Sequence, residues 1–204
     1  MKLKICGMKY QDNILDVAAL KPDYMGFIFY KNSERYITTC IPDLSKTIKK
    51  VGVFVNESNE NIKNTIEKHR LDAVQLHGQE PPEFCKQLKN ETLEIIKVFS
   101  IKSEFDFNQL TPYEPYVDYF LFDTKGPNPG GNGFCFDWSV LNYYNANKPY
   151  FLSGGIGLEQ VESLSTFKKS TAAKQCHAID INSKFELKPG LKDNIKLKKF
   201  IETL

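Results

Sequence analysis

The sequence has little arginine, little histidine and no long apolar segment. No apolar run approaches the roughly 18 residues that a transmembrane helix requires, so we expect no integral membrane protein and no membrane partner. The first ten residues, MKLKICGMKY, lack a long apolar segment and a small-residue cleavage pattern, which argues against a secretory signal.

Five cysteines are spread along the chain, at positions 6, 40, 85, 135 and 176. None forms a C-x-x-C pair, and the histidines at 69, 77 and 177 show no ligand spacing with them. We therefore expect no structural zinc and no other metal. An odd number of cysteines in a chain without a secretory signal indicates reduced thiols, which predicts a cytoplasmic protein.

The charge is nearly balanced, with 27 basic residues against 25 acidic ones and a net charge of +2. Nucleic-acid-binding proteins usually carry a larger or more clustered basic excess, so we expect no nucleic-acid partner. With 41% apolar and 25% charged residues, the chain has the composition of an ordinary globular protein. Its 204 residues suffice for one domain, which we expect to span residues 1–204.

Only two of the basic residues, Arg35 and Arg70, are arginines. The guanidinium offers a rigid two-pronged fork for a carboxylate or a phosphate, which an ammonium cannot copy. Arg70 follows a helical pattern, in EKHRL, and is best explained as the solvated end of a helix. Arg35 falls in a predicted loop and is the arginine of greater interest.

Short, continuous apolar runs alternate with helix-like segments along the whole chain. Such runs are typical of strands that are covered on both faces of a sheet. The predicted strands are residues 3–6, 24–30, 51–55, 73–76, 94–99, 118–122, 149–153 and 177–181. The predicted helical segments are residues 13–20, 44–50, 59–70, 83–89, 103–110, 138–144, 158–167 and 191–204.

Eight strands, each followed by a crossover segment, predict a closed parallel (β/α)8 barrel, or TIM barrel, with almost no insertions. The alternative is an open doubly wound sheet, which normally carries a glycine-rich phosphate turn after its first strand. The segment KICGMKYQ holds only Gly7, and the glycine-rich turns instead follow the sixth and seventh strands. We therefore favour a minimal α/β barrel.

In such a barrel the active site lies at the C-terminal ends of the strands. Three turns there predict a phosphate site, because glycines let backbone N–H groups approach an anion closely. They are GPNPGGNG at 126–133, SGG at 153–155 and INS at 181–183. A short helix starting near Ser183 would add its positive end. Ordinary turn chemistry explains each turn alone, whereas the three together favour phosphate.

Three chemically versatile side chains fall at the same end. Cys6 ends the first predicted strand and is either a small buried hydrophobe or a catalytic thiol. Asp123 follows the apolar run FLF, where a desolvated carboxyl favours its neutral form and can act as a general acid; alternatively it caps the turn at Thr124. His77 is expected to be a hydrogen-bonded residue at the rim.

These fragments together resemble one family. The segments KICGM, GFIFYKNSERYI, VGVFVN, VQLHGQE, FLFDT, GGNGFCFDW, LSGGI and AIDINSKFE-PGLKD occur in this order over nearly the entire chain. KICG, SERYI and LFDT at these spacings are similar to those of the phosphoribosylanthranilate isomerase family of tryptophan biosynthesis. The resemblance implies a minimal (β/α)8 barrel and a cofactor-independent Amadori rearrangement. Its substrate would be a small phosphorylated sugar, N-(5-phosphoribosyl)anthranilate, and its product 1-(2-carboxyphenylamino)-1-deoxyribulose 5-phosphate.

The resemblance also implies roles for individual residues. Cys6 of KICG would be the general base, Asp123 of LFDT the general acid, and Arg35 of SERYI the group that holds the anthranilate carboxylate. A thiol needs help to become a thiolate, and Lys4, on the same strand face as Cys6, is either that helper or a filler of the barrel interior. The phosphate would be bound by Gly131, Asn132, Gly133, Gly154, Gly155, Asn182 and Ser183.

The sequence departs from the family pattern at two positions near the expected phosphate. Asn132 stands where a small hydroxyl residue is usual, and Lys184 where a glycine is usual. We expect Asn132 to leave backbone donation to the phosphate intact, and Lys184 to cost some turn freedom while it adds positive charge. Neither should disturb the acid–base pair. Two other functions stay open: the related histidine-pathway isomerase, which normally has an aspartate in place of Cys6, and a non-catalytic phosphometabolite-binding barrel. The sequence leaves the choice between monomer and homodimer open.

Overall fold

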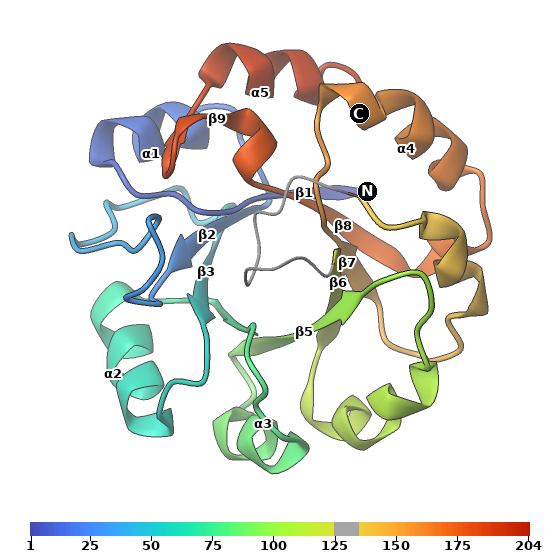
Figure 1. Ribbon diagram of the computed structural model, residues 1–204. Coiled ribbons are helices and arrows are strands. Elements are labelled where there is room, and N and C mark those ends of the chain that lie inside the picture. The colour runs from blue at the N-terminus through green and yellow to red at the C-terminus, as the bar shows by residue number, and fades with distance from the viewer. Residues whose placement is uncertain (125–134) are drawn as a thin grey trace.

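The computed structural model describes residues 1–124 and 135–204 of the chain. Eight parallel strands close into a barrel in the order β1 to β8, and helical segments surround the ring (Figure 1). The strands are β1 (Lys2–Ile5), β2 (Tyr24–Ile28), β3 (Lys49–Phe54), β4 (Ala73–Leu76), β5 (Glu94–Ile101), β6 (Tyr119–Thr124), β7 (Tyr150–Leu152) and β8 (Cys176–Ile181). The predicted (β/α)8 barrel is therefore confirmed, and the open sheet is wrong.

The α-helices pack outside the strands. They are α1 (Gln11–Ala18), α2 (Asn59–His69), α3 (Pro82–Leu88), α4 (Val161–Lys168) and α5 (Asn194–Ile201). The 3-10 segments are η1 (Phe107–Tyr116), η2 (Trp138–Tyr143), η3 (Leu158–Gln160), η4 (Ala172–Gln175) and η5 (Ser183–Phe185). Among the described residues, no helix is long and apolar enough to cross a membrane.

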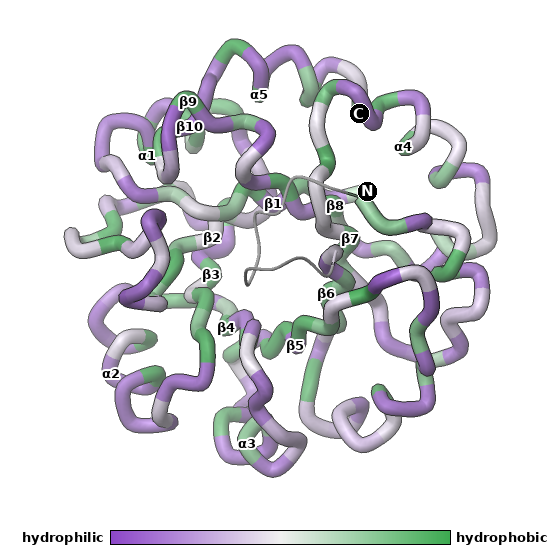
Figure 2. The backbone as a smooth tube through the Cα atoms, viewed as in Figure 1, coloured by the Kyte–Doolittle hydropathy of each residue, from purple (hydrophilic) through white to green (hydrophobic). Residues whose placement is uncertain are grey.

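The apolar residues form two layers, one on each side of the strands. The outer layer joins the strands to the helices and contains most of the buried apolar residues, so the strands are largely hydrophobic while the outer helices carry polar stretches (Figure 2). The inner layer fills the barrel and consists of Tyr24, Val51, Ala73, Ile96, Val98, Leu121, Phe151 and Ala178. Because these residues occupy the starts and middles of their strands, the pocket forms at the C-terminal ends.

Helix α2 shows how local signals fix an element. The Ser58 side chain accepts a hydrogen bond from the Asn61 N–H and so caps the N-terminus. Arg70 ends the helix in the left-handed conformation, with φ of 51°, and its side chain is exposed. The interpretation of Arg70 as a solvated helix end is confirmed.

The helix predicted at 44–50 does not form, and no helix occurs in residues 29–48, all of which the structure describes. Residues Lys49 and Lys50 belong to β3, which leaves too few residues for a stable helix. The Ser45 hydroxyl lies 2.9 Å from that of Thr47 and accepts from its backbone N–H, which competes with helical hydrogen bonding. The segment between β2 and β3 is therefore irregular.

The helix predicted at 191–204 begins later than expected. Two short strands, β9 (Glu186–Lys188) and β10 (Leu191–Lys192), pair as an antiparallel hairpin after β8. Gly190 in its turn has φ of +83°, a value that suits glycine. Asp193 then caps α5 by accepting from the N–H groups of Ile195 and Lys196. The Pro189-Gly190 pair thus marks the hairpin turn, and the helix start lies at Asn194.

The connections after β5 and β6 contain 3-10 segments where helices were predicted at 103–110 and 138–144. Pro112 and Pro115 lie inside η1, and each removes a backbone donor that an α-helix would need. The structure gives no comparable local reason for η2, which Asp137 caps as expected of a helix.

Candidate active site

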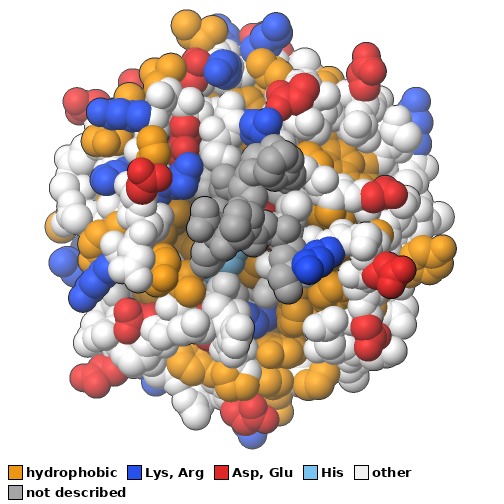
Figure 3. Space-filling model, in the orientation of Figure 1, with side chains coloured by type: hydrophobic (Ala, Val, Ile, Leu, Met, Phe, Trp, Pro, Cys, Tyr) orange, Lys and Arg blue, Asp and Glu red, His pale blue; other side chains and the backbone are white. Residues whose placement is uncertain are grey.

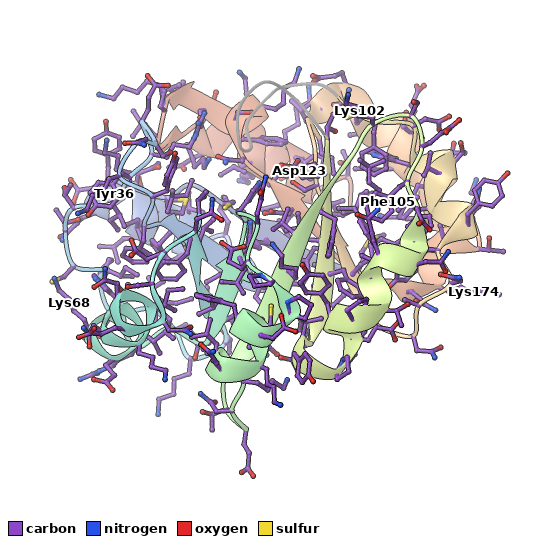
Figure 4. All side chains as sticks on the ribbon, turned by 60° about the horizontal axis from the view of Figure 1, so that its bottom comes forward. Tyr36, Lys68, Lys102, Phe105, Asp123 and Lys174 are labelled. Carbon is purple, nitrogen blue, oxygen red and sulfur yellow. The ribbon has the colours of Figure 1, made fainter. Side chains whose placement is uncertain are left out.

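A pocket lies at the C-terminal end of the barrel and is lined by residues from several strands and loops. It brings together Cys6, Arg35, Asp123, Gly154, Gly155, Asn182 and Ser183. Acidic and basic side chains are interspersed on this face of the molecule (Figure 3). Figure 4 shows Asp123 inside the ring of strands, whereas Lys68 and Lys174 lie at the periphery. Gly131, Asn132 and Gly133, the other predicted phosphate residues, lie outside the described residues.

Cys6 follows β1 and is buried, with 5% of its surface exposed. Its backbone N–H donates to the Ile181 carbonyl of β8 at 2.8 Å, which fixes the residue at the barrel rim. Gly26 of β2 makes room for the thiol, because a Cβ at that position would lie 2.6 Å from Sγ. Burial raises the pKa of the Cys6 thiol, and the positive charges of Lys4 and Lys192 oppose that shift.

Lys4 and Asp180 form a fully buried ion pair next to Cys6. Pairing of β1 with β8 places the two residues opposite each other, and Lys4 Nζ lies 2.9 Å from both carboxylate oxygens. Burial alone would lower the pKa of Lys4, but Asp180 and Cys6 raise it overall, so the ammonium stays charged. Lys4 is thus both part of the barrel interior and a cation close to the thiol.

Asp123 of β6 is buried beside His77 from the turn after β4. Its Oδ1 accepts from the backbone N–H of Thr124 at 2.9 Å, and its Oδ2 lies 3.6 Å from His77 Nε2. Gln75 Nε2 lies 3.1 Å from His77 Nδ1 on the other side of the ring. The turn contact that was one alternative for Asp123 therefore exists, and the second oxygen still faces the imidazole.

Arg35 lies in the irregular segment after β2 and lines the pocket. Its guanidinium is joined to the carboxylate of Glu186, with Nη2 2.7 Å from Oε2. Burial by itself would lower the pKa of Arg35, but the hydrogen bonds and charge of Glu186 raise it. Glu186 also accepts from Lys192, which is fully buried.

Glu186 and Lys192 received no role from the sequence. Both belong to the hairpin β9–β10, inside a segment that was predicted as loop and helix. The signal that could have located them is Pro189-Gly190, a typical turn pair, between two short segments that alternate polar and apolar residues.

The turns after β7 and β8 line the pocket. Gly154 and Gly155 have φ of +97° and +66°, and a Cβ at Gly154 would collide with Thr124. Both features require glycine there. After β8, Lys184 Nζ lies 2.9 Å from Glu159 Oε1 and so links the two turns. Within the described residues, no cluster of three histidine, cysteine or acidic side chains is arranged to hold a metal ion.

A closed parallel barrel with a thiol, a carboxyl and a guanidinium around one pocket defines a (β/α)8-barrel protein whose pocket has the chemistry of an enzyme active site. Comparison with known proteins is more specific. The family model for N-(5'-phosphoribosyl)anthranilate (PRA) isomerase matches residues 3–203. The chain belongs to this family, which confirms the resemblance seen in its sequence.

Individual relatives agree with this assignment. N-(5'-phosphoribosyl)anthranilate isomerase of Parabacteroides distasonis is 43% identical over 210 residues, covering 100% of this chain and 93% of the relative. The enzyme of Phocaeicola vulgatus is 42% identical, covering 100% and 98%. Among solved structures, the phosphoribosylanthranilate isomerase of Thermotoga maritima superposes with a TM-score of 0.84 at 34% identity, covering 100% of this chain and 98% of that one.

Proposed function

We propose that this chain catalyses the isomerisation of N-(5-phosphoribosyl)anthranilate in tryptophan biosynthesis, with Cys6 as general base and Asp123 as general acid. The observation that carries the proposal is that both side chains line one pocket together with Arg35. Cys6 follows β1 and Asp123 belongs to β6, so the fold brings together two residues that are distant in the sequence. A reaction that needs a proton donor and a proton acceptor on one sugar requires both groups at the same pocket.

The first step opens the ribose ring. Asp123, in its role as general acid, gives a proton to the ring oxygen while the bond from C1 to that oxygen breaks. The lone pair of the anthranilate nitrogen forms the new C1=N bond, which gives an open-chain iminium cation. The Asp123 carboxylate that remains still accepts the Thr124 N–H and faces His77 at 3.6 Å, so its new charge has partners.

The second step removes the hydrogen from C2. The iminium cation makes this hydrogen acidic, and the thiolate of Cys6 takes it, so that a C1=C2 bond forms and the nitrogen regains its lone pair. The resulting enol-amine tautomerises to the C2 ketone, which balances the reaction as an isomerisation without an external oxidant. Burial raises the pKa of Cys6, and we infer that Lys4, Lys192 and the iminium cation together favour the thiolate when it is needed.

The two ends of the substrate are anions, and the pocket offers donors for each. Arg35 is the partner that we assign to the anthranilate carboxylate, because a guanidinium binds a carboxylate with two parallel hydrogen bonds. Gly154, Gly155, Asn182 and Ser183 are the groups that we assign to the phosphate. A phosphoribosylanthranilate isomerase solved with reduced 1-(o-carboxyphenylamino)-1-deoxyribulose 5-phosphate is 31% identical, with a TM-score of 0.79, and covers 100% of this chain and 97% of that one.

We place the enzyme in the cytoplasm, where its pathway and its free thiols fit the reducing conditions. Both the monomer and the homodimer stay candidates. One relative with 31% identity, from Thermotoga maritima, is a dimeric enzyme that was also obtained as monomers.

The test is steady-state turnover of N-(5-phosphoribosyl)anthranilate by the purified protein and by the variants Cys6→Ser and Asp123→Asn. Each variant should lose about 10²–10⁴-fold in kcat while keeping its fold, because each removes one proton-transfer group. The aminoaldose substrate of the histidine-pathway isomerase is assayed in parallel. Preference for that substrate, or near-normal kcat/KM in either variant, would show that the proposed activity or its residues are wrong.

A further inference from the structure

The hairpin β9–β10 places two opposite charges behind the pocket. Glu186 and Lys192 have side chains that are 5% and 0% exposed, and they lie 2.8 Å apart. Neither belongs to the described residues that line the pocket. Burying charged groups is costly unless they are well paired, so their presence requires an explanation beyond surface chemistry.

Glu186 occupies one edge of the Arg35 guanidinium. Its oxygens accept from Nε at 3.0 and 3.1 Å and from Nη2 at 2.7 Å. A guanidinium is planar and has five N–H donors, so fixing this edge also fixes the direction of the opposite one. Among the described residues no acceptor contacts Nη1, which leaves that edge of Arg35 available at the pocket that it lines.

Lys192 holds Glu186 from the other side. Its Nζ donates to Glu186 Oε1 at 2.8 Å and to Asn182 Oδ1 at 2.7 Å. Its backbone N–H donates to Oδ1 of Asn13 in α1 at 2.7 Å, and its backbone carbonyl accepts from Asn13 Nδ2 at 3.0 Å. Gly190 N–H gives Glu186 a further bond at 3.0 Å. The carboxylate is therefore held from several directions and has little freedom to release Arg35.

The same cluster reaches the reacting centre through Gly7. A Cβ at Gly7 would lie 2.5 Å from Asn182 Oδ1 and 2.9 Å from Arg35 Cδ, so both side chains pack onto the backbone next to Cys6. Burial lowers the pKa of Lys192 to about 8, so at pH 7 two cations and one anion leave Arg35, Glu186 and Lys192 with a net positive charge. Glu186 alone would cancel the charge of Arg35, and Lys192 restores the attraction for an anion.

We infer that Glu186 and Lys192 are positioning residues, which hold Arg35 so that its free edge meets the carboxylate on the aromatic ring of the substrate. The inference rests on the function proposed above. It predicts that the hairpin controls how strongly the enzyme prefers a substrate with that carboxylate over one without it, although neither residue touches the substrate.

The test compares two substrates in each variant: N-(5-phosphoribosyl)anthranilate, and N-(5-phosphoribosyl)aniline made in the assay from aniline and ribose 5-phosphate. The ratio of their kcat/KM values measures the contribution of the carboxylate. In the unmodified enzyme we expect a ratio of about 10 to 100, as expected for a charge-assisted contact. Glu186→Gln should lower this ratio about tenfold, mainly by raising KM for the anthranilate substrate. The glutamine amide has an N–H2 donor in place of one carboxylate oxygen, so it cannot accept from both Arg35 and Lys192 as the carboxylate does.

Two further variants separate positioning from general damage. In an Arg35→Met background, Glu186→Gln should change the ratio no further, since both act through one contact. Glu94→Gln is the matched control: Glu94 pairs with Lys49 at the starts of β5 and β3, at the far end of the barrel from the pocket. It should leave the ratio unchanged. Lys192→Met should lower the ratio in the same direction as Glu186→Gln.

The ratio does not depend on the fraction of folded enzyme, so partial unfolding of a variant cannot imitate the result. The positioning role would be overturned if Arg35→Met lost the large ratio of the unmodified enzyme while Glu186→Gln kept it. That result would leave the proposed function intact. Absence of turnover of N-(5-phosphoribosyl)anthranilate by the unmodified enzyme would instead overturn the proposed function.

Discussion

Replacing Gly26 by alanine tests whether the position of the Cys6 thiol limits catalysis. The added methyl carbon would lie 2.6 Å from Cys6 Sγ and 3.2 Å from its Cβ. Non-bonded heavy atoms normally lie about 3.5–4.0 Å apart, so the thiol has to move by about 1 Å. A displacement of that size at a reacting group costs about 10²-fold in rate. We therefore expect kcat of Gly26→Ala to fall by about two orders of magnitude.

Gly52→Ala is the control for the packing strain. Gly52 lies on the neighbouring strand β3, and its Cβ would meet Leu71 at 2.5 Å and Phe54 at 2.7 Å, away from the thiol. Overpacking a core site costs about 1–3 kcal/mol, so both variants should lower the free energy of unfolding by a similar amount in urea titrations. Only Gly26→Ala should lose kcat. Equal kcat in both variants, measured at saturating substrate, would refute the argument.

Two further predictions concern Lys184 near the phosphate site and the reactivity of the Cys6 thiol. Lys184→Gly should raise KM several-fold and leave kcat unchanged. Glu159→Gln should lower KM, because Glu159 holds the ammonium of Lys184 at 2.9 Å and the glutamine variant would free that ammonium to bind the phosphate. Equal KM values in the two variants would contradict a role of Lys184 in binding. Burial raises the pKa of Cys6, so its alkylation by iodoacetamide at pH 7 should be slower than that of the exposed Cys40, and its rate should keep rising with pH beyond the ordinary thiol pKa of about 8.5. Mass spectrometry of the labelled peptides measures both rates, and a Cys6 rate that levels off below pH 8 would contradict the raised pKa.

Much of the fold could be predicted from the sequence because its signals are local. Apolar runs mark the eight strands, and Ser58 and Asp193 cap their helices directly. The failures are local as well. Residues 44–50 have a helical pattern, but the last two of them belong to β3. The strands of the hairpin are too short to show a clear alternation of polar and apolar residues.

The candidate site was predictable only in part. Cys6, Asp123 and the turn with Gly154 and Gly155 stand at strand ends, so the barrel rule brings them to one pocket. The bond between Arg35 and Glu186 joins residues 151 positions apart, and no periodicity or spacing encodes such a pair. The pair forms only because the fold brings the hairpin against the segment after β2.

The location of the hairpin has a consequence for the order in which the protein becomes functional. Cys6 and Arg35 are synthesised before Glu186 and Lys192, and 151 positions separate Arg35 from Glu186. β1 also waits for β8 before the ring can close. A nascent chain on the ribosome therefore carries its thiol and its arginine fork without the frame that aligns them until β8 and the hairpin β9–β10 have been synthesised.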